Sequence, residues 1–308
     1  MSSLIRIGTR DSELALWQAQ QVERQLGQLG INAVLCPVKS MGDIVLDKPL
    51  YELGVTGIFT KTLDIALLKG NIDIAVHSMK DVPTQLPDGV VQTAVLERAS
   101  TADVLLHKGI GFLNGTTGTI ATGSLRRRAQ WLNRYPEHQV VDLRGNVNTR
   151  MIKLIENDWN GAIFAKAGLE RIKLLPQDAL VLDWMIPAPA QGAMVVVALE
   201  SNQKAVECSK QLNHKESALA TYIEREFLRT LEGGCTAPIG ALAEIEEDRI
   251  SFRGCLHSLD GREMVAVSET VPINEWEGIG KRFANQMLDD GGSVLMKMIM
   301  DERNNPIH

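Results

Sequence analysis

The order of strand-like and helix-like segments constrains the fold of this chain more than any other feature. Between residues 4 and 77, short apolar strands alternate with amphipathic helices. The expected strands are Leu4–Gly8, Ala33–Val38 and Asp73–His77, and the expected helices are Glu13–Leu29 and Ile58–Lys69. The buried face expected for the first helix consists of Leu14, Trp17, Gln21 and Leu26. Strands that alternate with helices in this way predict a parallel sheet with crossover helices.

A second unit of similar size follows. Its expected elements are strands near Val91–Leu96, Asp103–Leu106, Thr119–Ala121, Val140–Leu143 and Gly161–Ala165, and helices at Leu125–Asn133 and Val147–Glu156. Two prolines and a Gln191-Gly192 pair then indicate a connection, and a buried strand is expected at Val195–Leu199. The pattern therefore predicts two α/β lobes, with a cleft between them.

The last third of the chain has a different pattern. A long helix at Ser217–Leu231 precedes three strands and two further helices. These are strands Ile239–Ile245, Ile250–Leu256 and Met264–Glu269, and helices near Trp276–Leu288 and Ser293–Asp301. This order predicts a smaller α+β third domain.

Positive charge is concentrated in the second unit. Residues 122–153 carry seven Arg or Lys side chains and two carboxylates, a net charge of +5 within a chain of −6. Thr122-Gly123-Ser124-Leu125-Arg126-Arg127 and Leu143-Arg144-Gly145-Asn146 both join a strand end to a helix start. Ligands of open α/β sheets bind at that edge, where helix N-termini and arginines attract anions. We expect a polyanion site here; a solvated basic face is the alternative.

A second candidate site follows the strand that ends at His77. Lys80 and Asp81 lie in His77-Ser78-Met79-Lys80-Asp81-Val82-Pro83, and Arg10 and Ser12 would reach the same edge. Asp81 could act as a general acid or base, or hold a cationic group. A surface ion pair is the alternative, although Pro83 should keep the segment extended. We interpret His77 as a core residue.

Cys235 is expected on a loop, because two glycines precede it and Pro238 follows it. It is either an inert small side chain or a point of covalent attachment. The four cysteines form no Cys-x-x-Cys pair and have no histidine at ligand spacing, so neither a metal site nor a disulfide framework is expected.

Composition excludes several classes of protein. A net charge of −6 gives no general attraction to nucleic acid or anionic membrane. No apolar run approaches the roughly 20 residues that span a bilayer, and the N-terminus lacks the pattern of a secretory signal. We expect a cytoplasmic protein. It is either an enzyme or, as the alternative, a two-lobed anion-binding or sensor protein without catalytic activity.

Several segments together resemble the porphobilinogen deaminases, or hydroxymethylbilane synthases, of tetrapyrrole and heme biosynthesis, nearly from end to end. The matching segments are Gly8-Thr9-Arg10 with Ser12 and Leu14-Ala15-Leu16, residues 73–83, Ser124-Leu125-Arg126-Arg127, Leu143-Arg144-Gly145-Asn146-Val147 with Thr149-Arg150, Ala167-Gly168-Leu169, Gln191-Gly192-Ala193, and Leu231-Glu232-Gly233-Gly234-Cys235 with Pro238-Ile239-Gly240.

The resemblance implies an enzyme with a covalent dipyrromethane cofactor on Cys235. It implies that four porphobilinogen molecules are joined head to tail with loss of ammonia, and that water releases the linear product. Asp81 is then the catalytic carboxylate. The residues implied to bind cofactor and substrate are Arg10, Ser12, Lys80, Thr122, Ser124, Arg126, Arg127, Arg144, Arg150, Arg171 and Gln191.

The same resemblance implies two periplasmic-binding-protein-like α/β domains with a cleft, plus a smaller α+β C-terminal domain. The expected limits are residues 1–95 with 193–213, residues 98–189, and residues 215–308. We expect a monomer that binds porphobilinogen, with no nucleic acid or membrane partner and no metal.

The chain departs from the family pattern at a few positions. Thr56 stands where a loop lysine is usual, and Thr62 where a glutamate is usual. Gly123 replaces a serine, and Pro189-Ala190 replaces Val-Gly. The residues assigned to cofactor attachment and catalysis all remain, so we expect an active enzyme.

Overall fold

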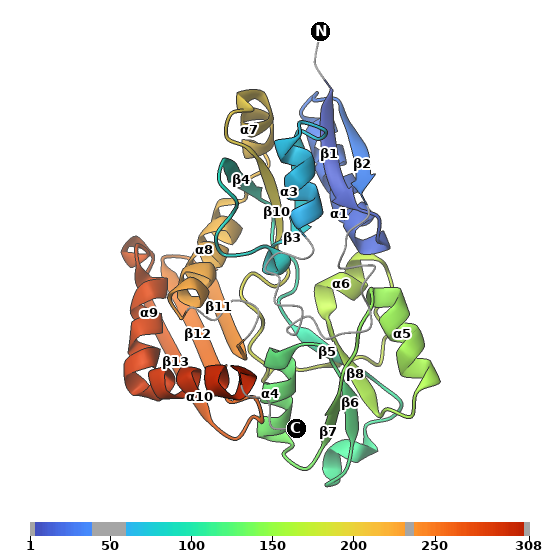
Figure 1. Cartoon of the computed structure of the whole chain (residues 1–308), viewed down its shortest axis with the longest axis vertical. Coiled ribbons are helices and arrows are strands. Elements are labelled where there is room, and N and C mark those ends of the chain that lie inside the picture. Colours follow the sequence, from blue (N-terminus) through green and yellow to red (C-terminus); the bar gives the residue numbers. More distant parts are fainter. Residues whose placement is uncertain (1–3, 39–59, 232–236, 305–308) are drawn as a thin grey trace.

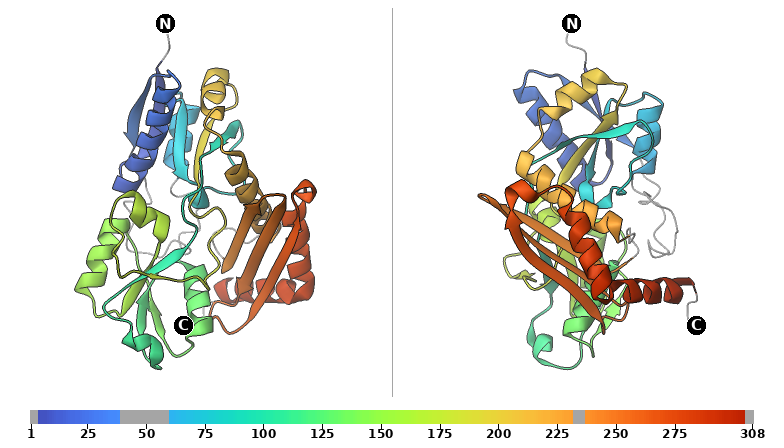
Figure 2. Two further views of the ribbon diagram at one scale, coloured as in Figure 1. Left: turned by 180° about the vertical axis from the view of Figure 1, so that it is seen from behind. Right: turned by 90° about the vertical axis from the view of Figure 1, so that its left-hand side faces the viewer.

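The computed structural model describes residues 4–38, 60–231 and 237–304, so Cys235 and the loop segment 54–59 with Thr56 lie outside the described residues. The described chain builds three sheets, each with its own helices (Figure 1). The left view of Figure 2 shows the same three bodies from behind. Two of these domains combine a sheet with helices on both faces, and the third is smaller.

The first sheet has the strand order β2-β1-β3-β10-β4. Its strands are β1 (Ile5–Arg10), β2 (Ala33–Val38), β3 (Ile74–Ser78), β4 (Val90–Val95) and β10 (Met194–Leu199). Strand β1 pairs in parallel with β2 and β3, as predicted, but β10 is antiparallel to both β3 and β4. The sheet is mixed because β10 enters from the second domain at the carboxyl end of β3, where Met194 pairs with Ser78.

Helices cover both faces of this sheet. Helices α1 (Glu13–Gln28) and α7 (Gln203–Lys210) pack on one face, and α3 (Lys61–Leu68) packs on the other. The prediction for the buried face of α1 was wrong except at Leu26: the buried residues are Ala15, Gln18, Ala19, Val22 and Leu26. Small side chains at this face bring the helix close to the sheet, and Trp17 lies at the edge of the packed surface, where it is only partly buried.

The second sheet has the order β7-β6-β8-β5-β9. Its strands are β5 (Asp103–His107), β6 (Thr119–Ala121), β7 (Gln139–Val141), β8 (Gly161–Ala165) and β9 (Leu180–Val181). Helices α5 (Val147–Glu156) and α6 (Lys166–Arg171) pack on one face, and α4 (Leu125–Arg134) buries Trp131 on the other. This is the second α/β lobe that the sequence predicted.

The third domain is an antiparallel sheet covered by helices. Strands β11 (Ile239–Glu246), β12 (Arg249–His257) and β13 (Met264–Pro272) follow one another in the sheet. Helices α8 (Lys215–Thr230), α9 (Ile279–Met287) and α10 (Ser293–Asn304) bury their apolar faces against it. The observed elements agree with the predicted α+β order.

A buried ion pair joins the three domains at their connections. The guanidinium of Arg98 donates to both carboxylate oxygens of Glu224 in α8, at 2.7 and 2.9 Å, and to the carbonyl of Gln191 at 2.8 Å. Glu224 also accepts from the backbone N–H groups of Ala190 (2.6 Å) and Ala243 (2.8 Å). We propose that the domains meet here, with the limits predicted from the sequence.

Ala190 shows what its departure from the family pattern does to the backbone. Its φ is +61°, a left-handed conformation that glycine adopts more readily than alanine, at a cost to alanine of about 1–2 kcal/mol. The charge-assisted hydrogen bond from its N–H to Glu224 holds it in this conformation.

Candidate active site

A cavity lies where the carboxyl edges of the first two sheets meet. It gathers eight of the residues predicted for the site, from both domains. These are Arg10, Ser12, Lys80, Asp81, Arg127, Arg144, Arg150 and Arg171. Among the described residues that line it, six are cationic and two, Glu13 and Asp81, are acidic. The cavity is therefore positively charged, as expected of a site that binds a polyanion.

The turn that carries Asp81 differs from the prediction. Met79–Asp81 form one turn of 3-10 helix, so the expected extended conformation of this segment was wrong. Pro83 restricts only the residue before it, and Val82 is indeed extended, with φ −88° and ψ 128°. The turn places Lys80 and Asp81 on the cavity wall, where the charge of Asp81 acts on both Lys80 and Arg150.

Arg225, which the sequence analysis missed, clamps this turn from the third domain. Its guanidinium reaches from α8 to the carbonyls of Met79 (3.4 Å), Val82 (2.9 Å) and Pro83 (2.5 Å). No local pattern marks it, because an arginine in an amphipathic helix looks like any solvated residue until its partners are known. The clamp ties α8 to the loop that bears Asp81.

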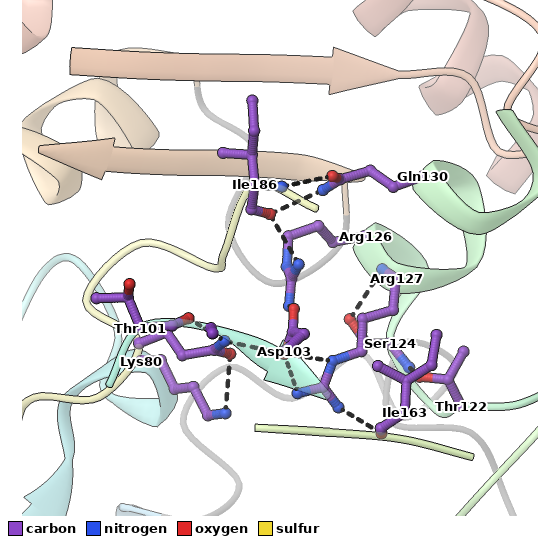
Figure 3. A network of polar contacts seen from close by, with 12 residues as sticks. Lys80, Thr101, Asp103, Thr122, Ser124, Arg126, Arg127, Gln130, Ile163 and Ile186 are labelled. Atoms are coloured by element: carbon purple, nitrogen blue, oxygen red, sulfur yellow. Dashed lines mark hydrogen bonds and ion pairs between the residues drawn. The ribbon is translucent and has the colours of Figure 1, made fainter. Parts of the chain in front are cut away.

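A buried carboxylate, Asp103, lies at the centre of a network of polar contacts that includes Arg127 and Lys80 of the cavity wall (Figure 3). Asp103 is fully buried and forms ion pairs with Arg126 at 2.8 Å and Arg127 at 2.7 Å. Gln191 donates to the same carboxylate at 2.9 Å and accepts from Lys80 Nζ at 3.3 Å. One acidic side chain thus positions two predicted arginines and connects them through Gln191 to Lys80.

Burial and charge act in opposite directions on Asp103. Burial alone would raise its pKa, but the charges of Arg126 and Arg127 outweigh burial, and the pKa lies well below its usual range. The carboxylate is therefore ionised at neutral pH. The sequence carried a weak signal for Asp103, which is an acidic residue directly before three apolar residues of a strand.

Four predicted residues do not line this cavity. Arg126 and Gln191 are buried beneath it, and Arg126 also donates to the carbonyl of Ile186 at 2.8 Å. Thr122 and Ser124 line a second cavity that also includes Asp260 and Glu302 of the third domain. The Ser124 hydroxyl caps α4 by accepting from the N–H of Arg127 at 3.4 Å. Roles for these four in ligand binding stay predictions.

Gly123 lies beside these residues, where the family usually has serine. A Cβ atom there would lie 2.6 Å from the carbonyl oxygen of Leu143, which is too close for any side chain without a backbone shift. The glycine therefore fits the close approach of the two strand ends that carry Ser124 and Arg144.

Several cations of the cavity lack a carboxylate partner in the part of the chain that the structure describes. Arg150 donates to the carbonyl of Gly145 (2.7 Å) and Arg171 to that of Gly192 (2.6 Å). Nε of Arg144 is buried and has no hydrogen-bond partner among the described residues. Burial lowers the pKa of both Arg150 and Arg171 to about 10, and lowers that of Arg144. Bound carboxylates would offset this cost.

Lys80 is the cation of the cavity whose charge is most sensitive to pH. Burial, followed by repulsion from Arg127, lowers its pKa to about 8. Its protonated form is favoured by nearby negative charge, so an anionic ligand would raise this pKa again.

Two helix N-termini also open on the cavity. Ser12, Glu13 and Leu14 begin α1, and Asn146, Val147 and Asn148 begin α5. Asn146 caps α5 by accepting from the N–H of Thr149 at 2.9 Å. Asn148 donates to Glu13 at 2.7 Å and so links the two domains across the cavity. Helix N-termini carry partial positive charge and add to the attraction for anions.

The described residues contain neither a metal-ligand cluster nor a membrane-spanning helix. Within the described ranges, no three His, Cys, Asp or Glu side chains are arranged to hold a metal ion. No helix in those ranges combines the length and the apolar character needed to cross a membrane.

Comparison with known proteins decides the family. The model for "Porphobilinogen deaminase, dipyromethane cofactor binding domain" matches residues 5–207, and the model for the C-terminal domain of porphobilinogen deaminase matches residues 218–289. The chain belongs to the porphobilinogen deaminase family. A porphobilinogen deaminase of Pelotomaculum thermopropionicum is 40% identical over 98% of this chain and 99% of its own length. That of Syntrophomonas wolfei is 41% identical over 95% and 97%, respectively.

Two solved structures to which the chain shows a low structural similarity are binding proteins. The methionine binding protein MetQ has a TM-score of 0.45 and 15% identity, covering 72% of this chain and 93% of that chain. A periplasmic substrate-binding protein of an ABC transporter from Coxiella burnetii has a TM-score of 0.42 and 14% identity, covering 72% and 96%.

Replacing Asp103 by Asn should lower the free energy of unfolding by about 3–5 kcal/mol, because two buried guanidinium groups would lose their shared counter-charge. Urea unfolding followed by circular dichroism measures the change. Glu207→Gln is the control, since Glu207 pairs with Lys210 on the surface and should contribute less than about 0.5 kcal/mol. Equal effects of the two substitutions would contradict the role of Asp103.

The pH dependence of the Asp103→Asn effect gives a further check. A carboxylate with a lowered pKa contributes stability above its unfolded pKa of about 3.9, and that contribution is lost as the pH falls below this value. The difference between wild type and D103N should be constant from pH 8 to about pH 5 and should shrink below about pH 4. A difference that stays constant down to about pH 3 would be inconsistent with a low pKa of Asp103.

Proposed function

We propose that this cavity is the active site of a porphobilinogen deaminase, in which carboxylates of cofactor and substrate bind to the cationic wall beside Asp81. The family reaction joins four porphobilinogen molecules head to tail with loss of ammonia and releases hydroxymethylbilane. The observation that carries the proposal is the surplus of cations, partly or fully buried, around one catalytic candidate, Asp81. A growing chain of pyrroles with two carboxylates each is a polyanion and requires such a wall.

The arginines of the cavity wall can contribute substantially to the binding of ligand carboxylates. Each hydrogen bond between an arginine and a carboxylate contributes roughly 1.5–3 kcal/mol. Arg144, Arg150 and Arg171 have no carboxylate partner in the described part of the chain, so they are free to pair with ligand carboxylates. Arg127 already shares Asp103, and its contribution to binding should be smaller.

The residues present fit a dipyrromethane group, whose carboxylates need several cations in one cavity. Arg10, Ser12, Lys80, Arg127, Arg144, Arg150 and Arg171 line the cavity and would hold these carboxylates. The binding roles that the family resemblance implies for Thr122, Ser124, Arg126 and Gln191, which do not line it, stay predictions. When bound, the group supplies the pyrrole ring to which the first substrate molecule is joined.

We propose Cys235 as the attachment point, through a thioether. Cys235 lies four residues after Leu231, the C-cap of α8, in the sequence. Four residues reach at most about 14 Å. The Arg225 clamp, one and a half turns before the end of α8, supports the idea that the attached group reaches the loop of Asp81.

Asp81 is the proposed catalytic carboxylate. The C–N bond of the substrate aminomethyl group breaks, the nitrogen leaves as ammonia, and positive charge develops on the pyrrole methylene. As a carboxylate, Asp81 accepts a hydrogen bond from the protonated aminomethyl nitrogen, which already carries the protons with which it leaves as ammonia, and its negative charge stabilises the positive charge left on the methylene. The cations around it bind the substrate carboxylates and so orient the methylene toward Asp81. We further propose that the protein acts as a monomer in the cytoplasm.

The attachment is tested by the intact mass of the protein. We expect wild type to be heavier than its sequence by a two-pyrrole adduct and Cys235→Ser to have the bare mass. Cys255→Ala is the matched control: burial raises the pKa of the Cys255 thiol to about 12, which keeps it unreactive, so this variant should retain the adduct. Active wild type with the bare mass would refute the attachment.

The role of Asp81 is tested by turnover. Asp81→Asn should retain the adduct and lose turnover by about 10²–10⁴-fold, the range expected when a charge positioned at the reacting atoms is removed. Release of ammonia from porphobilinogen measures turnover. Glu13→Gln removes the other negative charge of the wall and should stay within about tenfold of wild type, because the amide can still accept from Asn148. Near-normal turnover of D81N would rule out the proposed role.

The charge of Lys80 predicts a pH dependence. Protonated Lys80 attracts carboxylates, and its pKa of about 8 means that this attraction is lost as the pH rises through 8. We expect the rate at which the adduct forms on protein prepared without it, followed by intact mass, to fall above about pH 8, because no ligand carboxylate is then present to raise this pKa. Lys80→Arg should remove this fall, because a guanidinium stays charged. The same alkaline fall in K80R would show that another group causes it.

A further inference from the structure

Arg171 is held at the cavity wall by an unusual partner. Its guanidinium carbon lies 5.6 Å from the ring centroid of Trp17, within the range of a cation–π interaction. Arg171 belongs to α6 of the second domain, whereas Trp17 belongs to α1 of the first. The same arginine lines the active-site cavity on one side and, with Trp17, a groove on the other. Its side chain thus separates the two spaces.

The remaining contacts of Arg171 include no ion pair with a carboxylate among the described residues, although the charge of Glu170 acts on it. One N–H donates to the carbonyl of Gly192, in the connection that returns to the first domain. The neighbouring carboxylate, Glu170, forms an ion pair with Lys166 at 3.6 Å. An aromatic face attracts a cation but accepts none of the in-plane N–H groups of a guanidinium and adds no negative charge.

This differs from the way in which Arg127 is held. Asp103 fixes Arg127 with two hydrogen bonds and supplies a full counter-charge. Trp17 orients Arg171 while leaving its charge and most of its donors for a ligand. Because Arg171 is held by an aromatic ring and not by a carboxylate, it is positioned in advance and can still bind an anion.

We propose that Trp17 is a positioning residue that holds Arg171 ready to bind a carboxylate of the substrate, and so sets the affinity of the active site for porphobilinogen. This inference rests on the proposed function of the cavity. Trp17 itself need not touch the substrate.

The test measures KM and kcat for porphobilinogen in protein that carries the full adduct mass. Trp17→Leu should raise KM about 3–30-fold, the range expected for a partly desolvated cation–π contact, with kcat within about twofold of wild type. Trp17→Phe keeps an aromatic face and should restore most of the affinity. Trp184→Leu is the matched control, because it removes a second cation–π contact, with Arg134 at 4.9 Å, whose two residues do not line the cavity.

A double substitution distinguishes positioning from a general effect on packing. If Trp17 acts through Arg171, W17L should raise KM no further in an Arg171→Leu background. A readout without turnover is the rate at which the adduct forms on protein prepared without it, followed by intact mass; W17L and R171L should slow it to similar extents.

Three results would overturn the inference: a KM of W17L equal to that of W184L, the same rise of KM in the Arg171→Leu background as in wild type, or no recovery in W17F. Failure of the proposed function looks different, because wild-type protein would then release no ammonia from porphobilinogen. If W17L does not fold, two other variants decide the question. The inference then requires that R171L loses affinity for porphobilinogen and that W17F keeps most of it.

Discussion

The pairing of one buried carboxylate with two arginines supports the rest of the site. Asp103 begins a central strand of the second domain, and Arg126 and Arg127 begin the helix that follows β6. Two guanidiniums could not remain buried there without its charge. Through Gln191 the same carboxylate is connected to Lys80, which comes from the first domain. The wall of the cavity is therefore built on a carboxylate that belongs to the protein itself.

The cations of this cavity fall into two groups that differ in their electrostatic balance. Arg126 and Arg127 share a counter-charge inside the protein, so they are chiefly part of the framework. Arg144, Arg150 and Arg171 form no ion pair with a carboxylate among the described residues, although Asp142, Asp81 and Glu170, respectively, attract them from further away, and burial lowers their pKa. Only the second group gains a full ionic partner when a carboxylate arrives. Sequence alone treats all five as equal, because charge balance depends on contacts between distant segments.

Much of the fold follows from local pattern, and much of the site follows from motifs. The spacing of apolar residues and the positions of turn residues predicted both α/β lobes and the third domain, because each helix or strand buries one face. The antiparallel β10 did not follow from them, since its direction depends on where the chain returns from the second domain. The motifs predicted Arg144 and Asp81, both of which line the cavity. Asp103 and Arg225 remained hidden because their partners lie far away in sequence, at Arg126 and at Pro83, respectively.

The clamp of Arg225 limits the ways in which this molecule can change shape. Since α8 is bonded to the loop of Asp81, the helix that leads to Cys235 and the first domain behave as one mechanical unit at that point. The second domain is joined to that unit by several side-chain contacts: the exposed hydrogen bond from Asn148 to Glu13, the contact of Arg171 with Trp17, and the buried link from Lys80 through Gln191 to Asp103. Because one guanidinium bonds to three carbonyls of that loop, a displacement of α8 is passed directly to the turn that carries Asp81.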